Sequence, residues 1–227
     1  MSHRTPAHRA GPRAPETTSP LGLESGIVEV VPYDPRWSDA FAEAARELHA
    51  ALAEAARELH AALAEAAREL HAALGSSILA VHHVGSTAVP GLCAKPILDI
   101  LVSVPDFEAS LELVPRFEAL GYEFRADEEI ADRHYFRRRR GTATTHHLSL
   151  AEPTSHHHRV TIAFRDALRA DPALARRYGA LKTELAGRFP RDRAAYIAGK
   201  SAFVGDVLGR AGVDDARGSW AGGLGLA

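Results

Sequence analysis

Two short patterns in the middle of the chain have residue types that could bind a phosphate and a cation. Gly85-Ser86 follows the β-rich run 78–84, and the backbone N–H groups and hydroxyl of such a turn can hold an anion. Asp99 lies in the apolar run 97–104, where a buried charge is costly unless a partner offsets it. Together they predict a phosphate site beside a carboxylate that binds a cation or transfers a proton.

Hydrophobic periodicity predicts the elements that position these residues. The runs on either side of the turn are typical of strands, and the second is nearly continuous in apolar residues, as in strands covered on both faces. Further strands are expected at residues 27–31, 122–125, 134–138 and 146–150. A helix is expected over 107–120, ended by Gly121, although Pro115 would interrupt it.

From about residue 157 the pattern becomes helical. Three C-terminal helices are expected at residues 159–170, 172–189 and 191–211. Asp171 is a suitable N-cap for the second, because its side chain can accept from free backbone N–H groups. These elements predict an α+β fold in which a small mixed β-sheet packs on helices.

An eleven-residue segment, AEAARELHAAL, occurs three times without a substitution, at residues 42–52, 53–63 and 64–74. Its residues are strong helix formers, so one continuous helix is expected from about Pro35 to Leu74. Each copy makes almost three turns and rotates the helix face by only about 20°. The leucines therefore form a stripe along nearly one side of the helix.

Composition limits the class of protein. The chain has 227 residues, 46% hydrophobic and 25% charged, which suits one globular domain with appendages. We expect a domain over 26–212, a disordered arm at 1–25 and a flexible tail at 213–227. A net charge of -2 makes nucleic acid an unlikely partner. One cysteine and no long apolar run predict a cytoplasmic protein without a membrane partner.

The central motif HHVGSTAVPGLCAKPILDILV resembles the signature of the polymerase-β-like nucleotidyltransferase superfamily and, more closely, that of its GrpB branch. The resemblance covers about residues 28–212 and continues at 30–37, 146–148, 164–169, 178–182 and 196–203. It implies the nucleotidyltransferase fold. It also calls for about one copy of the eleven-residue repeat, so two copies are extra. Their uncovered leucine stripe predicts self-association through the 42–74 helix.

In that superfamily the Gly-Ser turn holds a nucleotide triphosphate, and three carboxylates hold two Mg²⁺ ions. Here Asp99 matches the first carboxylate, while Leu101 and His147 stand where the other two are expected. Mg²⁺ prefers oxygen ligands, so Asp99 and His147, joined by His83 or His134, suit Zn²⁺, Mn²⁺ or Fe²⁺ better. We expect Asp99 and His147 as catalytic residues and a divalent metal ion, Mn²⁺, Zn²⁺ or Mg²⁺, as cofactor.

Other polar residues have two interpretations each. Candidate phosphate ligands beside Gly85 and Ser86 are Thr87, Lys95, Arg165, Lys182 and Lys200. Tyr178 and Tyr196 lie one helical turn before a lysine and could stack a base, or could simply pack under a snorkelling lysine. The run 137–140 of four arginines forms either an exposed hairpin tip or a clamp on an acidic substrate. The histidine triplet 156–158 is expected in a solvated loop, and Cys93 as a free thiol.

These patterns lead to a nucleotidyltransferase-like protein that binds a nucleotide or other phosphorylated small molecule over Gly85-Ser86 and Asp99. Transfer would use Asp99 as metal ligand or base and His147 as ligand. The alternative is a non-catalytic binding, regulatory or partner module, as the resemblance to domains fused to dephospho-coenzyme A kinase implies. A third hypothesis makes the repeat helix an assembly element.

Overall fold

The computed structural model describes residues 36–126 and 131–213 of the chain. Three expectations fall elsewhere. The disordered arm at 1–25, the strand at 27–31 and residues 214–227 of the tail lie outside the described residues.

Helix α1, Arg36–Leu74, confirms the predicted continuous helix through all three copies of the repeat. Strong helix formers fill it, and within the third copy Arg68 pairs with Glu65 one turn earlier. The chain divides into two compact units, Met1–Arg57 and Glu58–Ala227, and the boundary falls inside this helix. The sheet and all the candidate site residues belong to the second unit.

The copies of the repeat have the same sequence but different burial. Ala66, Leu70 and Leu74 of the third copy belong to the hydrophobic core and are at most 2% exposed. In the first unit, Phe41 and Leu48 are 76% and 61% exposed. Leu48 and Leu70 occupy the same position of the repeat. Their neighbours in space, and not their own sequence, therefore decide which leucine is buried.

Five strands form one mixed sheet in the order β1-β2-β5-β4-β3. β2 and β5 run parallel, and the other neighbouring pairs run antiparallel. The strands are β1 Ala80–Val84, β2 Leu98–Ser103, β3 Tyr122–Phe124, β4 His134–Arg140 and β5 Ala143–Ala151. Each overlaps a run that the sequence predicts as a strand.

The helix expected over 107–120 is shorter in the structure. It is confined to α2, Val114–Ala119, after the 3-10 turn Ala109–Leu113. Pro115 lies in the first turn of α2, where its missing N–H costs nothing, so it starts the helix and does not interrupt it. Gly121 follows with φ +80°, as expected for a glycine that ends a helix.

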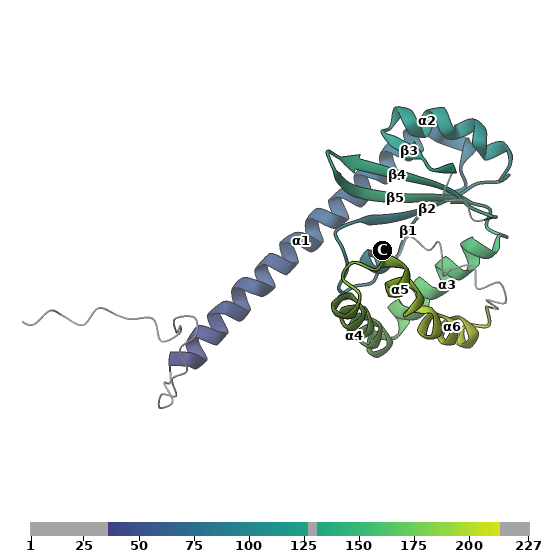
Figure 1. Ribbon diagram of the computed structural model, residues 1–227. Helices are drawn as coiled ribbons and strands as arrows, with labels where there is room; N and C mark the ends of the chain where they lie inside the picture. Colours follow the sequence, from purple (N-terminus) through teal and green to yellow (C-terminus); the bar gives the residue numbers. More distant parts are fainter. Residues whose placement is uncertain (1–35, 127–130, 214–227) are drawn as a thin grey trace, which may run out of the picture. The chain divides into compact units, whose positions relative to one another are not determined.

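Helices cover both faces of the sheet. On one face, Ile100, Phe136 and Leu148 pack in one core with Leu70 of α1 and Phe117 of α2. Figure 1 shows α2 on this side of the sheet and the C-terminal helices on the other. Those helices are α3 His156–Ala170, α4 Pro172–Arg188, α5 Arg193–Ala198 and α6 Ser201–Arg210.

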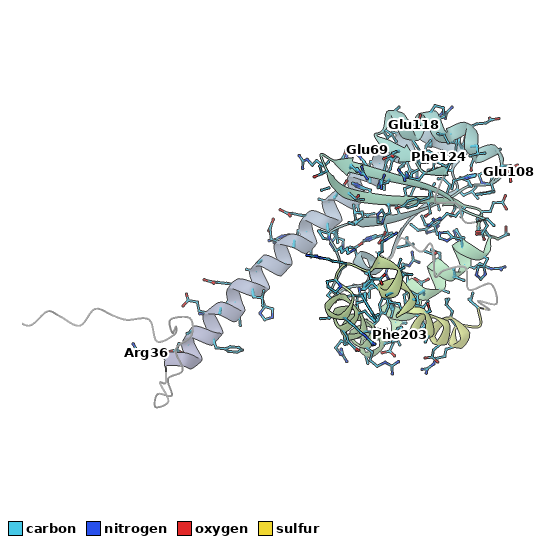
Figure 2. The ribbon with its side chains drawn as sticks, in the orientation of Figure 1. Arg36, Glu69, Glu108, Glu118, Phe124 and Phe203 are labelled. Carbon is cyan, nitrogen blue, oxygen red and sulfur yellow. The ribbon has the colours of Figure 1, made fainter. Side chains whose placement is uncertain are left out.

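The C-terminal helices have local signals that the sequence analysis identified. Asp171 caps α4 as predicted, because its side chain accepts from the backbone N–H groups of Ala173 and Leu174. Within this helical layer Phe203 of α6 stacks on Tyr178 of α4, with ring centroids 5.2 Å apart (Figure 2). The helices therefore have their own apolar core beside the sheet.

Two predictions about this layer are wrong. The third expected helix, 191–211, is two helices, because the chain turns at Gly199. A β-carbon there would lie 2.5 Å from Leu185 Cδ2. The histidine triplet 156–158 forms the first turn of α3 and not a solvated loop, and His157 is 5% exposed. Burial lowers the pKa of His157 to about 3, so this side chain is neutral in the core.

The architecture is α+β, as predicted: a five-stranded mixed sheet with a long N-terminal helix and C-terminal helices. Among the described residues, no helix is both long enough and apolar enough to cross a membrane. α1 has the length, but every copy of its repeat contains glutamate and arginine.

Candidate functional site

The strand register brings Asp99 and His147 together. Asp99 of β2 pairs with Val84 of β1 on one side and with His147 of β5 on the other, so these side chains share one face. The His147 Nδ1–H group donates to Asp99 Oδ1 over 3.0 Å. The two side chains are only 10% and 13% exposed. They form a buried polar pair between the sheet and the C-terminal helices.

Gly85 allows the turn after β1 to touch this pair. Its φ of +71° favours glycine, and a β-carbon there would lie 2.2 Å from Asp99 Oδ2. A larger residue would displace either the carboxylate or the turn. The Gly-Ser turn and the carboxylate thus meet at one end of β2, as their proposed joint role requires.

Burial changes the acidity of Asp99. It raises the pKa of this carboxyl to about 6, although the hydrogen bond from His147 and the charges of Lys200 and Lys182 act in the opposite direction. Such a carboxyl exchanges its proton near neutral pH, which is the range in which a general base is useful.

The space next to Asp99 is small. This Asp99 cavity has a volume of about 30 Å³, which is enough for water and far below the roughly 300 Å³ or more of a small-molecule site. Its lining includes His147, Thr161 and Tyr178. Thr161 Oγ1 and Tyr178 Oη are buried and have no hydrogen-bond partner among the described residues. The cavity can therefore hold water or an ion but not a nucleotide.

Lys182 of α4 connects the turn to the helical layer. Its ammonium group donates to Ser86 Oγ over 2.9 Å and to the carbonyl oxygen of Cys93. It also lies 5.0 Å from the ring centroid of Tyr178. Burial lowers the pKa of this lysine. Tyr178 is fully buried and stacks on Phe203, so its ring is not available to a base, and packing under the lysine is the interpretation that describes this arrangement.

A second, larger pocket also includes Ser86, and we call it the cation cleft. Its volume is about 520 Å³, within the range of small-molecule sites. Cationic side chains in its lining are Lys95, Lys182, Arg191 and Arg193, and aromatic ones are Phe189 and Tyr196. The described lining residues include no aspartate or glutamate. This charge distribution suits an anion.

Lys200 packs on Tyr196, a lining residue of the cation cleft, but does not itself line the cleft. It is 1% exposed, and its ammonium group lies 4.5 Å from the ring centroid of Tyr196. Burial lowers the pKa of Lys200 to about 8, and repulsion from Lys182, Lys95 and Arg193 adds to this effect. The cations around the cleft are thus close enough to repel one another.

Sequence reasoning missed Arg191 and Arg193. The continuous helix expected over 191–211 gave no reason to place either arginine at a binding site. In the structure both flank Asp192, which caps α5 by accepting from the backbone N–H group of Ala195. The available signal was this Arg-Asp-Arg pattern after Pro190, which is typical of a helix start with exposed flanking side chains.

His83 does not join Asp99 and His147. It pairs with Ile100 across β1 and β2, and therefore lies on the opposite face of the sheet. Its Nε2 lies 2.9 Å from Thr87 Oγ1. The expected metal ligand His83, in β1, and the expected phosphate ligand Thr87, in the turn after β1, thus contact each other.

Arg165 of α3 contacts the strand β1. It lines the Asp99 cavity and donates to the carbonyl oxygen of His83 over 3.1 Å. It also donates to Asp166 over 2.7 Å. With two acceptors within the protein, Arg165 holds the edge strand β1 against α3. The structure does not place it in the cation cleft.

The residues present do not fit a pair of Mg²⁺ ions. Among the described residues, no group of three histidine, cysteine, aspartate or glutamate side chains could hold a metal ion. Asp99 uses Oδ1 to bind His147, and Oδ2 lies against Gly85. Mg²⁺ needs several oxygen ligands, and this pair offers too few.

The arginine run 137–140 divides between two roles. Arg137 pairs with His147 in the sheet and bonds to Glu123, whereas Arg138 bonds to Glu69 of α1 over 2.8 Å (Figure 2). The last two arginines are exposed beside the turn at Gly141. The run is therefore partly a set of structural ion pairs and partly an exposed tip.

Known proteins resemble this chain over most of its length. A UPF0157 protein of Pseudomonas aeruginosa is 38% identical over 187 residues, which cover 81% of this chain and 67% of that protein. YqkA, a UPF0157 protein of Bacillus subtilis, is 32% identical over 180 residues, and the chain covers only 45% of its length. A crystal structure of the conserved protein GrpB from Enterococcus faecalis has 32% identity and a TM-score of 0.56. That match covers 79% of this chain and 94% of the other.

The family model described as GrpB protein matches residues 27–210. These residues include α1, the whole sheet, the Gly-Ser turn, the Asp99–His147 pair and the cation cleft. The agreement of the family model, the relatives and the solved structure shows that the chain belongs to the GrpB family.

Proposed function

We propose that this protein binds a nucleotide or another phosphorylated small molecule in the cation cleft, with a phosphate group against the Gly85-Ser86 turn. One observation carries the proposal. Four cationic side chains and Ser86 of the Gly-Ser turn line a cleft of ligand size whose described lining has no carboxylate. Lysine and arginine are the side chains that recognise phosphate most strongly.

The fold supports the same proposal. A Gly-Ser turn at the end of the first strand, beside an aspartate on the next strand, is the arrangement expected of a nucleotidyltransferase-like domain. The rings of Phe189 and Tyr196 in the cleft could stack on a base, which would favour a nucleotide over a simple phosphate ester. We propose in addition that the chain has this nucleotidyltransferase-like fold.

Isothermal titration calorimetry of the full chain tests this function. The ligands are nucleoside mono-, di- and triphosphates and inorganic pyrophosphate, each with and without Mg²⁺, Mn²⁺ or Zn²⁺. We expect one of them to bind and Lys182→Met to weaken its binding about tenfold, since a charge-assisted hydrogen bond is lost. Arg176→Gln is the matched control, because this exposed arginine of α4 lies outside the cleft. Failure of every phosphate to bind would overturn the proposal.

A second candidate function is group transfer, and the Asp99–His147 pair favours it. Ser86 lines both the Asp99 cavity and the cation cleft, so the two spaces meet at this residue. An acceptor hydroxyl would attack the α-phosphorus of a nucleoside triphosphate, pyrophosphate would leave, and the pair would receive the proton. Release of pyrophosphate by the native protein and its loss in Asp99→Asn would support transfer. Tight binding without release would support the non-catalytic alternative.

A further inference from the structure

We propose that the cation cleft binds its anion free of any divalent metal ion, with lysine and arginine side chains supplying all the counter-charge. The inference rests on the proposed function and defines the form in which the ligand binds. The charges of the lining side chains determine the charge balance within the cleft.

The described lining of the cleft has no aspartate or glutamate that could share a metal ion with the ligand. A metal-bound phosphate usually reaches a protein through carboxylates that share the metal. The described lining of the cleft provides ammonium and guanidinium groups and no carboxylate. A divalent ion carried on the ligand would face Lys95, Arg191 and Arg193 and be repelled.

The Asp99 carboxylate lines the small cavity and not the cleft. One of its oxygens accepts from His147, and a β-carbon on Gly85 would collide with the other. Rotating Asp99 toward the cleft would break its bond to His147 and leave the histidine without this partner. Asp99 is thus positioned to orient His147 and not to carry a metal ion with the ligand.

The cations converge from three separate segments. Lys95 comes from the loop before β2, Lys182 from α4, and Arg191 and Arg193 from the end of the α4–α5 connection and the first residue of α5. Lys182 is already held against the turn by Ser86 Oγ and the Cys93 carbonyl group. A ligand with two or more negative charges would relieve the mutual repulsion of these groups. Complexation with Mg²⁺ would remove much of that charge and weaken the attraction.

Titration of the full chain with inorganic pyrophosphate tests the inference. One buffer contains EDTA, and the other contains excess Mg²⁺ with the ionic strength matched by NaCl. We expect binding in EDTA and at least about threefold weaker binding in Mg²⁺, because the magnesium complex carries less negative charge. The double variant Arg191→Gln/Arg193→Gln should bind about tenfold more weakly in EDTA.

A matched control separates a built site from general charge attraction. Arg176→Gln/Arg177→Gln removes two exposed arginines of α4 that do not line the cleft. An equal loss of affinity in this control would overturn the assignment of the site to the cleft. Binding that requires Mg²⁺ would overturn this inference and leave the proposed function intact. Absence of binding by pyrophosphate and by all the nucleotides in both buffers would overturn the proposed function itself.

Discussion

The Asp99 carboxylate lies directly against Gly85, so that a β-carbon on Gly85 would fall 2.2 Å from Oδ2. Asp99 and Val84 are paired across β1 and β2, which places the residue after Val84 at the carboxylate. The contact couples the geometry of the proposed phosphate turn to that of the Asp99–His147 pair.

Gly85→Ala should unfold far more easily than the native protein. Alanine at φ +71° is strained, and its β-carbon would displace Asp99 in addition, so we expect a loss of about 3 kcal/mol or more. Gly141→Ala is the control, because Gly141 has φ +59° and a β-carbon there would meet no other side chain or backbone atom within 4 Å. Backbone strain alone should cost the control about 1–2 kcal/mol. Equal losses in urea denaturation would show that the contact with Asp99 is unimportant.

Asp99→Asn should raise the free energy of unfolding at neutral pH. The folded pKa of about 6 exceeds the unfolded value of 3.8, so the folded state binds more protons between these values. Native stability should therefore fall by roughly 2–3 kcal/mol as the pH rises from about 4 to 7. The stability of the Asp99→Asn variant should not fall in this way between pH 4 and pH 7. Thermal unfolding across this range measures it, and parallel curves for the two proteins would contradict the prediction.

Anion binding in the cation cleft should weaken above about pH 8. The pKa of Lys200 is about 8 in the unliganded protein, and a bound anion would raise it, so binding takes up a proton in this range. Calorimetry in buffers of different ionisation enthalpy detects this uptake. Lys200→Met should bind with a flatter pH dependence. A proton uptake unchanged by this substitution would assign the effect to another group.

Leu48 and Leu70 provide a matched pair for the effect of burial. They share the same repeat position, but Leu48 is 61% exposed and Leu70 is 0% exposed. In protein dilute enough to be monomeric, Leu70→Ala should cost about 3 kcal/mol, as for other buried leucines, and Leu48→Ala well under 1 kcal/mol. Chemical denaturation measures both. Similar costs in the monomer would contradict the prediction that burial within the chain separates these two leucines.

The repeat helix should mediate self-association. Deleting residues 42–63 removes two copies and retains the third, whose Ala66, Leu70 and Leu74 belong to the core. Light scattering after size exclusion should show dimers or larger species for the full chain and a monomer for the deletion variant. A full chain that stays monomeric at high concentration would refute the proposal.

Local signals in the sequence were sufficient to predict several features of the fold. The repeat of strong helix formers predicted α1, and Asp171 before Pro172 predicted the start of α4. A helix start or a continuous helix depends on residues within one or two turns, which the sequence displays directly. The resemblance to the GrpB family, carried by the central motif, was also confirmed.

Other features depend on residues far apart in the chain. Strand alternation alone did not show that His83 faces away from Asp99, because the face is decided by the register of β1 on β2. The cation cleft needed Arg191 and Arg193, whose positions follow from the turn between α4 and α5.

The sequence by itself determined the family, the α+β class and the long helix, and it predicted a Gly-Ser turn beside a carboxylate. Only the tertiary structure decided which of the candidate side chains meet. It united Asp99 with His147, separated His83 from them, and buried Leu70 while Leu48 stayed exposed. The physical reason is that local propensity acts through neighbours in sequence, whereas burial, pairing and charge clustering act through neighbours in space.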